Sequence, residues 1–153
     1  MIDTPNVPEP VWQLMQQKLG CDDAQMAEFK QVPRNQRAAA TAMTMVNKII
    51  VFEVVESHGC FNDHETGHRL FFGGDATLLT EPAPPRICAH LLSQIGPLVF
   101  TIQELTYAGV DPNVLCFNRA ACIDVGRECG GWGRVVVEAK VLDRADAEPL
   151  MLG

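Results

Sequence analysis

The sequence contains no run of about 20 apolar residues, the length that a helix needs to cross a bilayer. Its first ten residues, MIDTPNVPEP, lack the basic and apolar segments of a secretory signal. Basic residues are scarce and scattered, with 12 Lys and Arg against 19 Asp and Glu, for a net charge of −7. An acidic surface repels phosphate backbones and anionic headgroups. We therefore expect a cytoplasmic protein whose partners include neither nucleic acid nor membrane.

Two common motifs are also missing. The segment GGD at 73–75 lacks the lysine of a phosphate-binding loop, and ECGGWGR at 128–134 lacks the pattern of a loop that enters a helix. We expect CGGWG to form a tight turn instead, with Trp132 packed over the strand ends. The six cysteines include no CxxC pair. In a reducing compartment they are expected to be free thiols or metal ligands, with a disulfide framework as the alternative.

The 153 residues are 47% hydrophobic and 20% charged, which is typical of one globular domain with a single core. Helical spacing of apolar residues predicts short helices over 10–19 and 23–31. The following segment, RNQRAAATAMTMVN, has no firm period and is expected to be a linker. The β-branched run IIVFEVVES at 49–57 predicts a strand.

The second half predicts further strands and helices. HRLFF and ATLLT are expected to form a hairpin around Gly73 and Gly74, and ICAHLLSQI a helix that Gly96 and Pro97 end. LVFTIQELTYAG is ambiguous and weakly favours helix. VLCFN and GRVVVEAKV at 133–141 are expected to be strands. The segregated order predicts an α+β fold, with a small, mostly antiparallel sheet, one or two packed helices and an N-terminal helical arm.

This pattern divides the chain into three parts: an N-terminal helical docking arm and linker (1–45), an α+β domain (46–142) and a C-terminal tail (143–153). Two helices this short cannot stand alone in water. We expect the arm to dock on a partner through apolar side chains, which are Trp12, Leu14, Met15, Met26 and Phe29.

The segment HGCFNDHETGH at 58–68 holds three of the four histidines. Zinc favours thiolate and imidazole ligands drawn from separated loops. This loop offers His58, Cys60, His64 and His68, and a second group downstream comprises Cys88, His90, Cys116, Cys122, Asp124 and Cys129. A catalytic alternative pairs Cys60 or Cys122 with His64 or His68 and uses Asp63, Asp75 or Asp124 to orient the base. A solvated polar loop is the third interpretation.

The order of these motifs resembles a poorly characterised family of small cysteine-containing α+β proteins. Its members commonly show Cys, Gly-His, Gly-Asp, Ile-Cys and then Cys-Pro-Asp. Here the likeness covers residues 46–141 and rests on Cys60, Gly67-His68, Gly74-Asp75, Ile87-Cys88 and Cys122-Ile123-Asp124. The chain departs from that pattern in the insertion NDHET and in Ile123, where proline is usual. The resemblance implies Cys60, His68, Cys88 and Cys122 as a Cys₃His zinc site, with His58, His64, Cys116 and Cys129 as alternates.

In size and organisation the chain also resembles the small subunit of acetophenone carboxylase and hydantoinase-type enzyme complexes. This likeness implies a non-catalytic accessory subunit whose partners are the larger enzyme subunits of a hetero-oligomeric complex. The zinc of the Cys₃His site would then be its structural cofactor. The ATP and substrate chemistry would lie on those larger chains. Two alternatives are a small stand-alone metal- or thiol-dependent enzyme and a metal or redox sensor.

Overall fold

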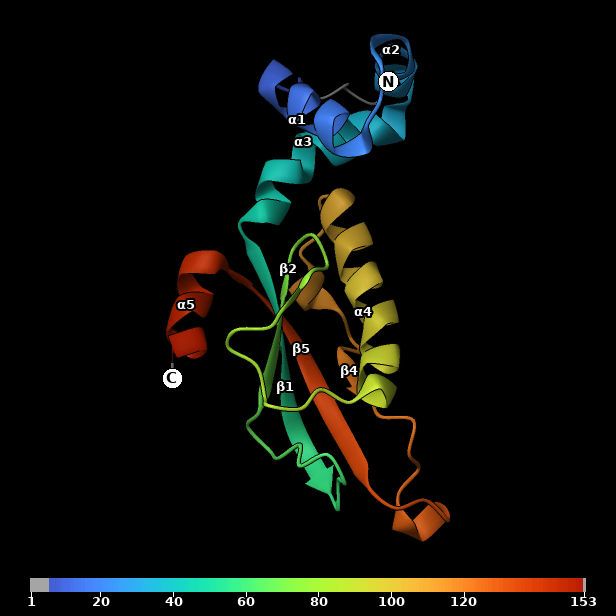
Figure 1. Ribbon diagram of the computed structural model, residues 1–153, viewed down its shortest axis with the longest axis vertical. Helices are drawn as coiled ribbons and strands as arrows, with labels where there is room; N and C mark the ends of the chain where they lie inside the picture. Colours follow the sequence, from blue (N-terminus) through green and yellow to red (C-terminus); the bar gives the residue numbers. More distant parts are fainter. Residues whose placement is uncertain (1–5, 153) are drawn as a thin grey trace.

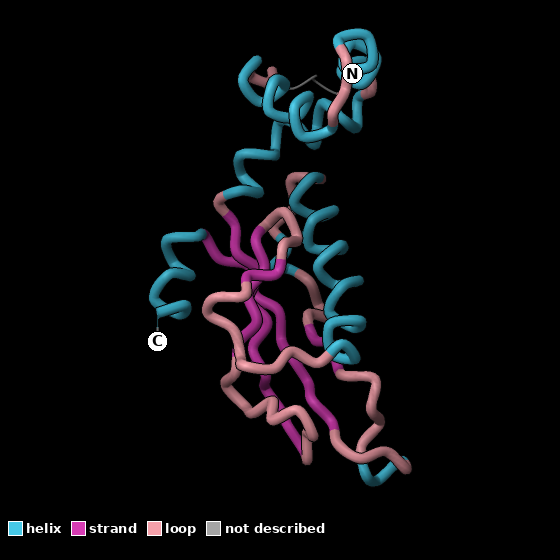
Figure 2. The backbone as a smooth tube through the Cα atoms, viewed as in Figure 1, coloured by secondary structure: helices cyan, strands magenta, loops and turns pink. Residues whose placement is uncertain are grey.

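A computed structural model describes residues 6–152 and confirms the expected α+β fold (Figure 1). The described residues form one antiparallel sheet in the order β3-β2-β1-β5-β4. Its strands are β1 (Lys48–His58), β2 (Arg69–Gly73), β3 (Leu78–Leu79), β4 (Arg119–Ala121) and β5 (Arg134–Asp143). Figure 2 shows this sheet in one half of the molecule and most of the N-terminal helices at the other end.

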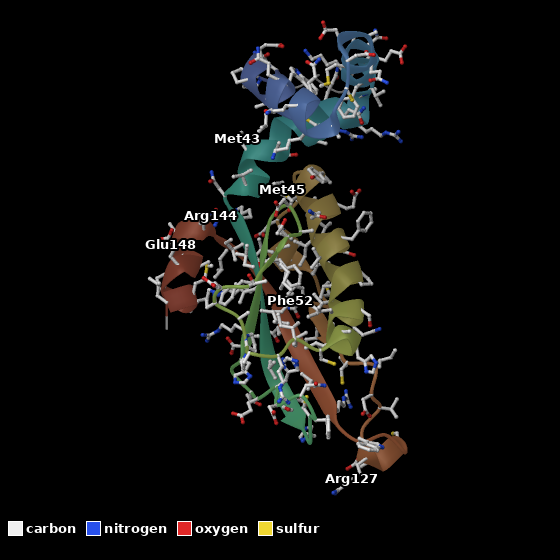
Figure 3. The ribbon with its side chains drawn as sticks, in the orientation of Figure 1. Met43, Met45, Phe52, Arg127, Arg144 and Glu148 are labelled. Atoms are coloured by element: carbon white, nitrogen blue, oxygen red, sulfur yellow. The ribbon has the colours of Figure 1, made fainter. Side chains whose placement is uncertain are left out.

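Strand β1 is central because both of its faces are apolar. Ile50, Phe52 and Val54 face helix α4 (Ala89–Tyr107), and the Phe52 ring meets Phe72 edge to face at 5.6 Å (Figure 3). On the opposite face, Ile49 packs with the fully buried Ala147 of helix α5 (Arg144–Leu152). The two helices thus cover the two sides of the sheet (Figure 1).

Helix α4 continues through Pro97, so the expected break at Gly96-Pro97 is wrong, and the helical interpretation of LVFTIQELTYAG is confirmed. The buried stripe of Leu91, Ile95, Val99 and Ile102 runs past the proline at helical spacing. Pro97 itself is exposed. Its ring has no N–H to donate to the carbonyl four residues earlier, that of Ser93, but this carbonyl lies on the solvent side, where water can bond it.

The N-terminal arm contains three helices, α1 (Glu9–Leu19), α2 (Asp23–Gln31) and α3 (Pro33–Val46). The first two match the prediction, with a left-handed Gly20 after α1 and an Asp22 capping box before α2. The predicted linker is wrong, because it forms α3. Its small residues allow close helix packing: Ala39 is buried with Val11, Trp12 and Met26 in a separate cluster, the arm cluster.

Other boundaries also differ. The expected tail forms α5, which packs on the sheet, and VLCFN forms a turn of 3₁₀ helix (Pro112–Val114) and a loop before β4. Residues 1–5 of the arm and residue 153 of the tail lie outside the described residues. None of the helices within 6–152 is both long and apolar enough to span a bilayer.

Gly74, at the β2–β3 turn, touches the end of α3. A Cβ atom there would overlap the carbonyl oxygen of Met45 and lie 2.8 Å from its carbon, and neither backbone can easily move. We expect Gly74→Ala to destabilise the fold by about 1–3 kcal/mol in chemical unfolding. Gly96→Ala, in open space within α4, is the control and should stabilise by about 0.5–1 kcal/mol. Equal effects of the two substitutions would contradict this packing.

Candidate functional site

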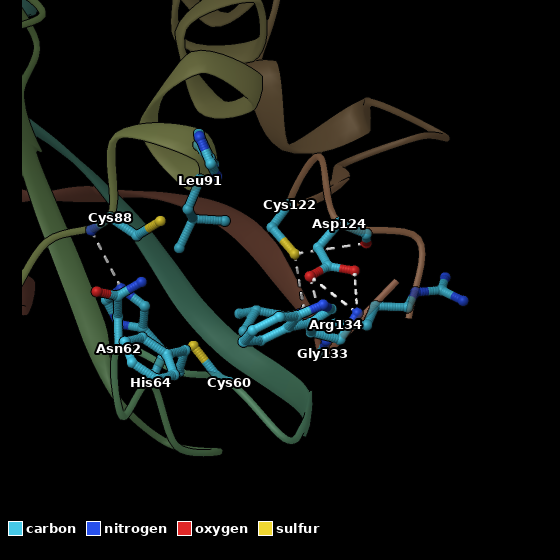
Figure 4. Close-up of a pocket in the computed structure, with 13 residues that line it drawn as sticks. Cys60, Asn62, His64, Cys88, Leu91, Cys122, Asp124, Gly133 and Arg134 are labelled. Atoms are coloured by element: carbon cyan, nitrogen blue, oxygen red, sulfur yellow. Dashed lines mark hydrogen bonds between the residues drawn. The ribbon is translucent and has the colours of Figure 1, made fainter. Parts of the chain in front are cut away.

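Three cysteines from separate elements face one cavity of about 260 Å³ at the end of the sheet (Figure 4). We call this cavity the thiol pocket. In Figure 4 the sulfur atoms of Cys60, Cys88 and Cys122 surround the space below Leu91. The remaining wall is formed by Phe61, Asn62, His64, His90, Asp124, Trp132, Gly133, Arg134 and Val135.

Each cysteine is placed by the end of a regular element. Cys60 follows β1, and Cys88 is the N-cap residue of α4. Cys122 follows β4 and extends its pairing with β5, since its N–H donates to the Val135 carbonyl at 2.8 Å. The Val135 N–H in turn donates to the Cys122 sulfur at 3.2 Å. Such a donor supports a sulfur that carries negative charge.

His64 links the loop between β1 and β2 (residues 59–68), here called the histidine loop, to α4. Its side chain is only 2% exposed, and its Nε2 accepts a hydrogen bond from the Cys88 N–H at 3.3 Å. Burial lowers the pKa of His64, and the neighbouring His68 adds to this effect, partly opposed by Asp63. A neutral imidazole can accept this bond, so His64 holds the start of α4 against the loop that carries Cys60.

Only three of the four predicted zinc ligands lie in the thiol pocket. Cys60, Cys88 and Cys122 line the thiol pocket, whereas His68 does not, and its Nδ1 accepts from the Glu65 N–H at 3.2 Å. Of the alternates, His64 lines the pocket. The Nε2 of His58 lies 3.8 Å from the Oε2 of Glu56, outside the pocket. Cys116 and Cys129 also lie outside it and are exposed.

With the side chains as they stand, no three His, Cys, Asp or Glu groups within residues 6–152 are placed to hold a metal ion. The cysteine thiols lie around the cavity instead of meeting at one point. Each can be redirected by rotation about its Cα–Cβ bond into another staggered rotamer. The donor types therefore fit a soft metal ion, and closing the cavity around it requires such rotations.

Asp124 organises the loop that forms one wall. Its carboxylate accepts backbone N–H bonds from Gly126 at 2.9 Å, Trp132 at 3.0 Å and Gly133 at 3.1 Å. The bonds from Gly126 and Gly133 are the main reason that its pKa lies below the ordinary value. A Cβ at Gly131 would overlap this carboxylate, so that glycine is needed for close approach. Asp124 thus bonds backbone amides, not the imidazole that the catalytic interpretation required.

Trp132 differs from its predicted position over the strand ends. Its side chain is 77% exposed, and its ring meets that of Phe61, itself 80% exposed, edge to face at 6.4 Å. This pair stands on the rim of the thiol pocket. Sequence reasoning did not place Phe61, Leu91 or Val135 at the site, because apolar side chains carry no signal that separates a pocket wall from the core.

No family model matches the chain, and comparisons with curated proteins and with solved structures also give no match. The two resemblances therefore stay expectations.

The Asp124 carboxylate should make stability depend on pH. Because its pKa in the folded state is below the ordinary 3.8, the charged form adds stability above that value, which is lost as the pH falls through the lowered pKa. Asp124→Asn should therefore be less stable than the wild type near neutral pH, and the difference should shrink below about pH 4. Chemical unfolding at a series of pH values measures it. A difference that does not change with pH would contradict the role of the charge.

Proposed function

We propose that the thiol pocket holds one zinc ion as a structural part of the domain. The observation that carries this proposal is that three thiols, from three separate elements, face one cavity (Figure 4). Zinc accepts thiolate and imidazole ligands and needs no redox partner. An ion bound here would join the loop after β1, the start of α4 and the end of β4. Metal binding would then contribute directly to folding.

In this proposal the chain is a non-catalytic accessory subunit of a larger cytoplasmic enzyme, of the carboxylase or hydantoinase type that its organisation resembles. The six cysteines form no disulfide within residues 6–152. Of the five apolar side chains expected to dock, Leu14 is half exposed, whereas Trp12 and Met26 are buried in the arm cluster and Met15 and Phe29 are partly buried against it. Four apolar side chains on helices α1 and α3 are each about half exposed and form the proposed docking face: Leu14, Leu19, Met43 and Val46.

A small thiol-dependent enzyme or a redox sensor is the second candidate. The open cavity beside the thiols and the presence of His64 and His90 on its wall favour it. An activated thiol needs a base within hydrogen-bond reach. Within residues 6–152 no imidazole is hydrogen-bonded to a thiol, and His64 bonds the Cys88 backbone instead. This geometry favours the structural metal site over the catalytic one.

Replacing one pocket cysteine should remove both metal and stability. We expect Cys60→Ser, Cys88→Ser and Cys122→Ser each to abolish stoichiometric zinc in elemental analysis. Each should also lower the free energy of unfolding by more than about 3 kcal/mol, because bound metal stabilises the folded state. Cys116→Ser is the matched control, since this exposed thiol lies outside the pocket. It should keep the metal and change stability by less than about 0.5 kcal/mol.

Two results together would refute the metal site: wild-type protein purified without chelators contains no metal, and added zinc leaves its free energy of unfolding unchanged. Loss of metal from Cys116→Ser as well would show that the pocket cysteines have no special role.

The accessory role predicts a change in native size. The wild-type chain, isolated from its native host, should elute from a size-exclusion column together with its larger partners. Leu14→Glu or Met43→Glu should elute as the free chain, because a charge in an apolar interface is costly. Phe100→Glu is the control, as Phe100 is exposed on α4, outside the arm. A wild-type protein that elutes as a monomer would contradict the accessory role and favour the second candidate.

A further inference from the structure

A structural zinc site is almost always tetrahedral with four ligands, so three thiols leave one position to fill. Among the four histidines, only His64 and His90 line the thiol pocket. His68, the ligand implied by the family resemblance, uses its Nδ1 to accept the Glu65 N–H within its own loop. His58 lies along a neighbouring groove, near Glu56. The choice is therefore between His64 and His90.

His64 is already committed to another role. The lone pair on its Nε2 accepts the Cys88 N–H, and its side chain is almost fully buried. Turning this nitrogen toward an ion would leave the N–H of Cys88 without its partner and would release the histidine loop from α4. An unsatisfied buried donor costs about 1–3 kcal/mol. His64 is thus better suited to hold Cys88 in place than to bind the ion.

His90 has no competing partner. Within residues 6–152 its ring takes part in no hydrogen bond and no ion pair. The Ser93 hydroxyl donates to the His90 backbone carbonyl, not to the ring. It lies in the first turn of α4, two residues after Cys88, and lines the same cavity as the three sulfurs. Its side chain is exposed, so it can change rotamer without losing buried contacts.

We propose that His90 is the fourth ligand, completing a Cys₃His zinc site with Cys60, Cys88 and Cys122, and that His64 is a positioning residue for Cys88. This inference rests on the metal binding proposed above and concerns which nitrogen completes the site. On binding, the three thiols release their protons to solvent and His90 stays neutral, so the site carries a net charge of −1. The sulfur and imidazole side chains turn inward, and the cavity below Leu91 closes.

The test measures zinc affinity of the full-length protein by competition with a chromophoric chelator. We expect His90→Ala to bind zinc at least about 100-fold more weakly, because it removes a direct ligand. His68→Ala, the matched control from the same histidine-rich segment as Cys60, should change affinity by less than about threefold. His90→Cys should restore binding, since a thiolate also suits zinc. His64→Ala should lower thermal stability even in metal-free protein.

Cobalt(II) replaces zinc in a second measurement and reports the ligands by absorption. His90→Cys should intensify the sulfur-to-cobalt charge-transfer band relative to the wild type, because a fourth thiolate replaces the imidazole. Weaker binding in His68→Ala with unchanged binding in His90→Ala would overturn the assignment while leaving the metal site itself in place. Wild-type affinity in His90→Ala, or an unchanged cobalt spectrum in His90→Cys, would overturn it too. Failure of the wild-type protein to bind zinc at all would instead refute the proposed function.

Discussion

The antiparallel pairing of β1 with β5 is the constraint on which both the core and the thiol pocket depend. It runs from Lys48 opposite Asp143 to His58 opposite Arg134, and beyond that end Gly133 lies directly against the Gly59 backbone. The chain therefore leaves β1 toward Cys60 beside the start of β5, to which Cys122 is also bonded. Packing of α4 on the same sheet brings Cys88 to this end. Burying each large core side chain, such as Phe52, contributes about 1.5–3 kcal/mol, so the core that holds the pair together also holds the thiols near one another.

The sequence predicted those elements whose pattern is strong and local. The β-branched residues of β1 and β5 and the caps of α1 and α2 identified their elements, because each signal lies within a few residues. Helix α3 was missed because the side chains that it packs into the arm cluster are Ala39 and Ala42, which are too small to mark a buried stripe in the sequence. Helix α5 is short and carries Pro149, and only its contacts with the sheet, through Ala147, Leu150 and Met151, make it recognisable. Tertiary packing therefore decided these segments, as it did the course of α4 past Pro97.

The candidate site was predictable in its thiols and unpredictable in its histidines. All three cysteines chosen from the sequence, Cys60, Cys88 and Cys122, line one cavity. Four histidines gave no such guide, because the direction of a side chain in a loop depends on backbone hydrogen bonds that spacing does not reveal. His64 and His68 are only four residues apart, yet His64 accepts the backbone N–H of Cys88 in the pocket wall and His68 accepts that of Glu65 within the loop. The rim pair of Phe61 and Trp132 depends in turn on Asp124, whose bonds to three backbone amides form only after the loop has folded.

The thiol pocket and the arm lie at opposite ends of α4. His90 is in its first turn, whereas Glu104 and Tyr107 face α3 across a groove near its other end. At 1.5 Å per residue these positions are about 21–26 Å from His90 along the helix axis, and Figure 1 shows the arm beyond the far end of this helix. Substitutions so far apart, with no shared partner, are expected to act additively. A metal ion in the pocket would therefore stabilise the domain without changing the docking face proposed for the arm. If the chain binds partners as proposed, metal loss would release it from them only by unfolding it. The two proposed roles, metal binding in the thiol pocket and partner binding through the arm, would thus belong to separate parts of one small chain that α4 holds apart.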